Sequence, residues 1–118
     1  MPTKLMSMNT IAALATKDFM TDSDQGPTSL RFIGAPSRVV FVINAIAVGL
    51  ELEVLTQYRR ILERSAIEGG GTAGVYPNLL DKGQAFDAAA GEILEFRVRE
   101  VANVATNKAN LVISVEAY

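Results

Sequence analysis

The residues best suited to chemistry in this chain of 118 are carboxylates and arginines gathered around one apolar segment. The acidic members are Glu51, Glu53 and Glu63, and the basic members are Arg59, Arg60 and Arg64. Paired carboxylates can transfer protons or bind a hard cation such as Ca²⁺. Here the opposite charges are interleaved, a pattern that favours ion pairs on a solvated sheet face over a carboxylate active site. A carboxylate-dependent enzyme is therefore the least favoured function.

The glycine cluster at residues 69–74 is the one feature that suggests a phosphate cradle. It matches neither GxxxxGK[ST] nor GxGxxG, and no strand–loop–helix pattern surrounds it. We expect a surface loop that could become ordered against a neighbouring subunit.

The acidic stretch at residues 22–27 imitates the start of a calcium-binding loop. Such a loop closes with a glutamate at its twelfth position, and that position is Ile33 here. The sequence therefore predicts a turn and no metal site.

The composition narrows the function further. The chain has no cysteine, which excludes disulfides, zinc–thiolate sites and thiol nucleophiles, and it has no histidine, the usual acid–base group near neutral pH. With 11 basic and 13 acidic residues spread along the chain, there is no basic block to grip a nucleic acid. These features predict a protein that is not an enzyme, has no cofactor and does not bind nucleic acid.

Membrane insertion is not expected either. The N-terminus lacks the sustained apolar run of a secretory signal, and the longest apolar stretch, residues 39–47, is interrupted by Asn44 and is too short to cross a bilayer. We expect a soluble protein or a component of an assembly.

The last 28 residues carry the clearest structural pattern. Apolar and charged residues alternate over residues 92–101, and a second alternating run covers residues 109–118. This period of two is typical of half-buried strands, and two such runs joined by turn-forming residues predict an antiparallel β-hairpin. Glu116 is then expected to pair across the hairpin with Arg97 or Arg99.

The middle of the chain also favours strands. Residues 29–33 predict a short strand, and the β-branched run 38–43 predicts a strand buried on both faces. Residues 50–68 fit either strands or a helix ended by the glycines that follow, and we favour strands because the flanking segments are β.

The first 28 residues differ from the rest because their apolar residues are scattered and a polar turn at 21–27 ends them. Thr10 could cap a short helix here. The segment fits a first element packed on the core equally well as an arm that reaches a neighbouring subunit. We divide the chain into an extended N-terminal arm, residues 1–28, and a mostly-β domain, residues 29–118.

Four stretches resemble the small capsid decoration (cement) proteins of tailed bacteriophages. They are residues 62–67, Val75-Tyr76-Pro77-Asn78, residues 90–99 and the closing run to Tyr118. The resemblance covers residues 37–118 and rests on strand order and turn chemistry. It implies an antiparallel β-sandwich of jelly-roll type, with six to eight strands, that sits as an oligomer on the outer shell and ties capsomers together.

On this interpretation the chain is a virion structural protein on the capsid surface, assembled in the host cytoplasm. Its partners are the major capsid protein and further copies of itself, as a homodimer or homotrimer. The expected contact residues are Leu5, Met6, Met8, Phe19 and Met20 in the arm, with Tyr76 and Tyr118 in the domain. The alternative is a small ligand- or carbohydrate-binding β-sandwich module, with the loop from Gly69 to Tyr76 at its binding edge and Tyr58 nearby.

Overall fold

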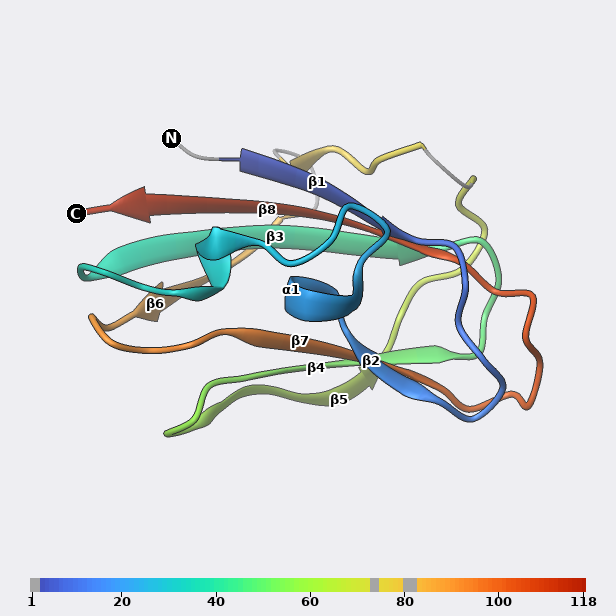
Figure 1. The fold of residues 1–118 in the computed structure, drawn as a ribbon. Coiled ribbons are helices and arrows are strands. Elements are labelled where there is room, and N and C mark those ends of the chain that lie inside the picture. Colours follow the sequence, from blue (N-terminus) through green and yellow to red (C-terminus); the bar gives the residue numbers. More distant parts are fainter. Residues whose placement is uncertain (1–2, 73–74, 80–82) are drawn as a thin grey trace.

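The structure is a computed structural model, and it describes residues 3–72, 75–79 and 83–118 (Figure 1). Eight strands account for nearly half of the described chain. They are β1 (Thr3–Met8), β2 (Thr16–Asp18), β3 (Ser37–Ala45), β4 (Leu50–Leu55), β5 (Arg60–Ala66), β6 (Gln84–Ala88), β7 (Glu95–Glu100) and β8 (Ala109–Ala117). A four-residue helix, α1 (Phe19–Asp22), and a 3₁₀ turn, η1 (Ser29–Arg31), lie between β2 and β3.

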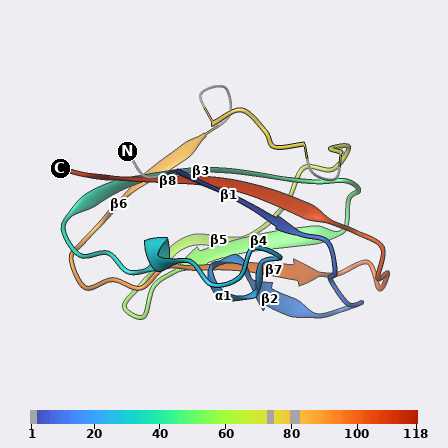
Figure 2. The ribbon, with the colours of Figure 1, turned by 45° about the horizontal axis from the view of Figure 1, so that its top comes forward.

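The strands form two antiparallel sheets of four, in the orders β1-β8-β3-β6 and β2-β7-β4-β5. Figures 1 and 2 show the sheets as two stacked layers. The predicted mostly-β antiparallel sandwich of six to eight strands is confirmed. No helix in the described part of the chain has the length and apolar composition needed to cross a membrane.

The core fills the space between the two sheets, and alternating residues build it. On β4, Leu50, Leu52 and Val54 are buried, whereas Glu51 and Glu53 lie on the outer face. The ring of Phe96, on β7 of one sheet, meets the ring of Phe41, on β3 of the other, edge to face at 5.1 Å between centroids. Side chains from both sheets thus interlock, as aromatic pairs in well-packed cores do.

Residues 50–68 are strands, as favoured from the sequence. β4 and β5 pair with each other, and a turn joins them in which the Thr56 N–H donates to the carbonyl of Arg59 at 2.8 Å. The pairing is irregular on β5, where the register shifts twice. Such bulges twist an edge strand and discourage pairing with other chains.

The predicted terminal hairpin is wrong, although both of its strands exist. β7 pairs with β2 and β4, whereas β8 pairs with β1 and β3 in the opposite sheet. The apolar faces of β7 and β8 meet across the core, and alternation specifies which face is buried without specifying the neighbouring strand. The expected pairing of Glu116 with Arg97 is wrong for the same reason, since Arg97 pairs with Glu95 and Glu53.

The expected N-terminal arm is also wrong. β1 pairs with β8 along its whole length, and β2 pairs with β7, so residues 3–28 belong to the sandwich. Met6, Met8, Phe19 and Met20 are completely buried in the shared core. The helix proposed after Thr10 is replaced by a turn in which the Ala15 N–H donates to the carbonyl of Ala12. The division at residue 28 therefore does not separate two structural parts.

The segment at residues 29–33 forms a 3₁₀ turn and a single bridge, and the predicted strand there is wrong. Ser29–Arg31 is capped by Thr28, whose hydroxyl accepts from the Leu30 N–H. Phe32 then makes one isolated antiparallel bridge to Ile93. The predicted strand at residues 38–43 is confirmed as β3, an interior strand, but it is not buried on both faces throughout, since Arg38 is exposed and Val40 is half-buried.

Candidate functional site

A recess of about 630 Å³ lies at the end of the sandwich where β3 begins and β8 ends. The turn between β4 and β5, the turn after β6 and the C-terminal residue all contribute to it. Its lining residues are Pro36, Tyr58, Arg59, Asp87, Ala88, Ala89, Ala90, Glu92 and Tyr118. Three alanines and a proline contribute apolar surface to this open recess, and two tyrosines also line it.

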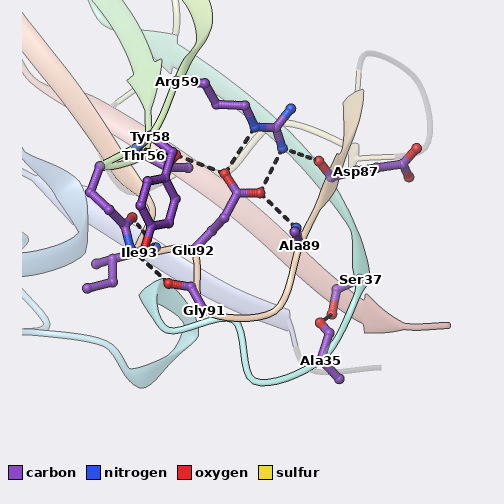
Figure 3. Close-up of polar contacts among 11 residues, drawn as sticks. Ala35, Ser37, Thr56, Tyr58, Arg59, Asp87, Ala89, Gly91, Glu92 and Ile93 are labelled. Atoms are coloured by element: carbon purple, nitrogen blue, oxygen red, sulfur yellow. Dashed lines mark hydrogen bonds and ion pairs between the residues drawn. The ribbon is translucent and has the colours of Figure 1, made fainter.

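Glu92 is one of the lining residues, and its carboxylate lies at the centre of the hydrogen bonds drawn in Figure 3. Its side chain is 5% exposed, and one of its oxygens accepts from the Thr56 hydroxyl at 2.8 Å and from Arg59 Nε at 3.0 Å. The other oxygen accepts from Arg59 Nη2 at 2.9 Å and from the Ala89 N–H at 2.7 Å. Arg59 also donates to the carbonyl oxygen of Asp87. The carboxylate thus joins the β4–β5 turn to the turn after β6.

These contacts fix the charge of Glu92. Hydrogen bonds from Arg59 lower the pKa of Glu92 from its ordinary 4.5 to about 2, against the opposing effect of burial, and the Ala89 N–H and the Thr56 hydroxyl also lower it. A carboxylate with this pKa stays ionised at neutral pH and is a poor general acid or base. The geometry of Glu92 therefore points to a structural role.

Gln57 strengthens the same junction. Its amide nitrogen donates to the carbonyl of Gly91 at 2.8 Å, and its amide oxygen accepts from the Ile93 N–H at 2.7 Å. The Tyr58 N–H donates to the Thr56 hydroxyl at 3.2 Å. Tyr58 consequently lies on a turn that Gln57 links to residues 91 and 93, and the Thr56 hydroxyl accepts from its backbone N–H (Figure 3).

The two tyrosines at the recess are the most exposed aromatic residues in the described chain, Tyr58 at 76% and Tyr118 at 78%. Tyr118 is nevertheless held in place, because its N–H donates to the carbonyl of Pro36 at 3.0 Å and its hydroxyl donates to the Asp87 carboxylate. That last hydrogen bond raises the pKa of Tyr118. Exposed rings on a rigid base suit contact with another molecule, since tyrosine is enriched among the residues that dominate binding energy at interfaces.

The apolar surface continues past Tyr58. Phe32 and Ile93, which form the isolated bridge, are both exposed, and the guanidinium of Arg31 lies 4.5 Å from the centre of the Phe32 ring. Ile93 is also tied to the Tyr58 turn through Gln57. Exposed apolar side chains thus lie on backbone segments that are linked to the Tyr58 turn.

The structure brings only one of the predicted contact residues to this site, Tyr118. Leu5 is half-exposed on β1, and Tyr76 is half-buried in the segment after the glycine cluster. Met6, Met8, Phe19 and Met20 cannot serve as surface contacts in this fold because the core covers them completely. The scattered methionine and phenylalanine residues, which predicted an arm, belong to strand β1 and the short helix α1, and their side chains fill the core.

The charged set singled out in the sequence lies on the outer face of the second sheet. Glu53 pairs with Arg60 at 3.2 Å and with Arg97 at 3.6 Å, and Glu51 pairs with Arg64 at 3.0 Å. The predicted salt-bridged sheet face is confirmed for these residues. Arg59 does not pair on this face; its ion pair is with Glu92 at the end of the sandwich. Within the described residues, no group of three or more acidic side chains could hold a metal ion.

The described part of the glycine cluster runs beside the end of β3. The Gly70 N–H donates to the carbonyl of Ile46 and the Gly71 N–H to that of Ala45, while a Cβ at Gly69 would lie 2.6 Å from the Val48 nitrogen. Residues 73–74 of the cluster lie outside the described residues. Glycine is required here for close backbone approach, which explains the cluster without a bound phosphate.

The loop that contains Tyr76 and the turn that contains Tyr58 lie at opposite ends of the sandwich. The carbonyl of Val75 accepts from Asn110, which pairs with Asn44 near the last residues of β3, whereas the Tyr58 recess adjoins the residues before β3. The binding edge suggested for a ligand module, with Tyr58 beside the Gly69–Tyr76 loop, is therefore wrong.

The polar turn at residues 22–27 forms hydrogen bonds with β1 and the residue that follows it. The Asp24 carboxylate accepts from the Asn9 N–H at 2.9 Å and from the Ser7 hydroxyl, and the Gln25 side chain exchanges two hydrogen bonds with Ser7. The predicted turn is confirmed, and its side chains cover the outer edge of β1.

Sequence reasoning missed the ion pair of Arg59 with Glu92 and the position of Tyr58 and Tyr118 around one recess. A usable signal was present, because Thr56-Gln57-Tyr58-Arg59 stands between two strand patterns and an aromatic residue in such a turn is exposed.

Comparison with protein-family models, with curated proteins and with solved structures finds no match for this chain.

Proposed function

We propose that the chain is a virion structural protein, a decoration or cement protein that oligomerises on the outer shell of a tailed-phage capsid and stabilises contacts between capsomers. The observation that carries the proposal is the tyrosine-flanked recess on its ion-paired base. Tyr58 and Tyr118 remain exposed, while hydrogen bonds fix the backbone of Tyr58 and the hydroxyl of Tyr118. Large rigid aromatic groups bind a partner at low entropic cost. The partners in this proposal are the major capsid protein and other copies of the chain.

The order of the strands supports a jelly roll. β1 pairs with β8, β2 with β7, β3 with β6 and β4 with β5, as expected when four consecutive strand pairs of one long antiparallel ribbon roll into two sheets. Eight-stranded jelly rolls are common in viral capsid domains. Fold alone does not assign function, so this is support by analogy.

The test is whether the chain co-sediments with assembled virions. An antibody against the purified chain is applied to density-gradient fractions of virions from the culture that carries the gene. The proposal expects the signal in the particle fractions and its release on mild heating before the shell breaks. A signal confined to the unassembled fractions would refute it.

Substitutions then test the recess. Tyr58→Ser and Tyr118→Ser are expected to lower particle binding at least tenfold while leaving the unfolding midpoint nearly unchanged, because both side chains are exposed. Arg64→Ser is the matched control, an exposed residue on the outer sheet face away from the recess. Equal loss of binding in all three variants would speak against the recess as the contact.

The second candidate is a ligand- or carbohydrate-binding module, and one observation favours it. Two exposed tyrosine rings with the Asp87 carboxylate beside them resemble the mixture of apolar and polar groups in sugar sites. A glycan array followed by calorimetry separates the candidates. A stable monomer that binds one sugar through Tyr58 and Tyr118 would favour the module over the assembly protein.

A further inference from the structure

A cavity between the two sheets opens on the side of the sandwich where β5 and β6 are the edge strands, and we call it the side slot. Its volume is about 290 Å³. Six apolar residues line it, namely Phe41, Val42 and Ile43 on β3, Leu52 on β4, Leu62 on β5 and Ile67 just after β5. The side slot shares no described residue with the tyrosine-flanked recess, so it is a separate site.

The side slot exists because neither edge strand closes its sheet completely. Within the described residues, β6 pairs with β3 only from Ser37 to Phe41, whereas β3 continues to Ala45. On the other sheet, the register of β5 against β4 shifts twice. A bulge of this kind bends the strand that carries it. The two sheets are therefore not sealed against each other along this side.

The opening leaves part of the core uncovered. Phe41 and Leu52 are each only 3% exposed, but Ile43 and Leu62, which pack against the same core, are only partly buried. Protein interiors contain few voids larger than a water molecule, so an unfilled space of this size beside core residues is unusual. Covering these apolar side chains would be favourable, because apolar surface gains free energy when it is removed from water.

Polar groups stand at the mouth of the side slot. Gln84 on β6 lies opposite Phe41 in the register, and Ser65 on β5 lies opposite Leu52. Residues directly opposite each other share one face of a sheet, so both polar residues are on the core side. The Gln84 amide forms no hydrogen bond with another described residue, and the Ser65 hydroxyl donates to the carbonyl of Glu63, which leaves its oxygen able to accept. Both can bind a polar group that enters from solvent.

Size and charge narrow the class of ligand. A cavity of about 150 Å³ can hold one benzene ring. The side slot, at about 290 Å³, therefore has room for roughly ten heavy atoms. Glu68 is the one charged residue in its described lining, which holds no basic group to pair with an anionic ligand. A neutral ligand fits this lining better than a carboxylate does.

We propose that the side slot binds a small neutral amphiphile, a molecule of about ten heavy atoms with an aliphatic body and one hydroxyl group. The aliphatic body lies between the sheets against Phe41, Leu52 and Leu62. The hydroxyl remains at the mouth, where Gln84 and Ser65 can hydrogen-bond to it. Ligand sites commonly combine an apolar lining with a few such polar groups. For a ligand of this size we expect a Kd on the order of 0.1 mM. This inference goes beyond the proposed function and does not depend on it.

The test is a titration of the isotope-labelled full chain with 1-octanol, followed by the NMR signals of the backbone amides. The signals of Ile43, Leu52 and Leu62 should shift together along one saturable curve. Sodium octanoate, which has a chain of the same length and a carboxylate, should bind at least tenfold more weakly at neutral pH. Shifts that do not saturate, or that are as large at the exposed Tyr58 and Val48, would overturn the proposal. Equal binding of octanol and octanoate would refute the neutral head group.

A variant that fills the side slot makes the result specific. Ser65→Phe adds a ring at the mouth on the core side, and it should weaken octanol binding at least tenfold while the urea midpoint stays the same or rises. Arg64→Phe is the matched control, because it adds the same ring to the residue that pairs with Glu51 on the outer face, and it should bind octanol within twofold of the parent. Unchanged binding by Ser65→Phe, or equal loss in both variants, would place the ligand elsewhere and overturn the proposal. The titration of the parent chain needs no variant, and virion binding is measured separately, so either proposal can fail without the other.

Discussion

Glu92→Gln is expected to lower the free energy of unfolding by about 2 kcal/mol at neutral pH. The carboxylate accepts four hydrogen bonds, two on each oxygen. An amide nitrogen cannot accept, so whichever way the glutamine is turned, at least one donor from Arg59 or Ala89 faces another donor. Charge-assisted bonds contribute roughly 1.5–3 kcal/mol, and Arg59 is half-exposed and can be rehydrated, which moves the expected loss below the upper value.

The pKa of Glu92 gives an independent magnitude. A fall from 4.5 to about 2 corresponds to at most about 3.4 kcal/mol, and solvent screening at Arg59, whose side chain is 47% exposed, reduces this to about 2 kcal/mol. The pKa is lower in the folded state, so the unfolded state binds more protons between the two values. The stabilisation is therefore complete above pH 4.5 and is lost as the pH falls towards 2.

The assay is urea unfolding of the parent chain and the variant from neutral pH down to about pH 2. The difference in unfolding free energy should be near 2 kcal/mol at neutral pH. It should shrink through the acid range, because the parent loses the stabilisation by its ionised Glu92 carboxylate, which the variant lacks at every pH. Glu95→Gln, on the exposed pair with Arg97, is the control and should change stability by about 0.5 kcal/mol or less. A Glu92→Gln effect no larger than the control, or one that does not depend on pH, would refute the reasoning.

Three further predictions concern the core and the backbone. Phe96→Ala should cost about 3–5 kcal/mol in urea unfolding because the ring is fully buried against Phe41, whereas the exposed Phe32→Ala should cost about 1 kcal/mol or less. Deletion of residues 1–20 should abolish cooperative unfolding and the β-type circular dichroism spectrum, and a folded truncation would contradict the position of β1 in the sheet. Gly49→Ala should lower stability by about 2 kcal/mol, since φ is +116° and the added carbon would lie 2.7 Å from a neighbouring side chain; an unchanged urea midpoint would count against that backbone geometry.

The alternation of residues predicted the strands well, because burial of one face is a local property. Leu50, Leu52 and Val54 point inward together, and so do Phe96 and Val98. Which strands lie side by side depends on contacts between distant segments, which alternation does not record. The terminal hairpin was mispredicted for this reason: β7 and β8 follow each other in the chain yet belong to different sheets.

The site was less accessible from the sequence than the fold. The ion pairs of Glu51 and Glu53 followed from interleaved charges on neighbouring strands. The recess depends on the meeting of Tyr58, Tyr118 and Glu92, which come from separate turns and from the last residue of the chain. The N-terminal arm failed as a prediction because Met6 and Phe19 have the same residue types whether they fill a core or reach a neighbour.

The pairing of β1 with β8 has a consequence for how the protein is made. Thr3 lies opposite Ser114, so β1 is synthesised long before β8, and the hydrogen bonds between them can form only once β8 has been made. Until then Met6 and Met8 have no β8 to pack beside. Contacts between residues so far apart slow folding and prolong the exposure of apolar surface. We expect refolding from urea on a timescale of milliseconds to seconds, as in other β-sandwiches, and a yield during synthesis that falls with temperature as unpaired strands meet those of other chains.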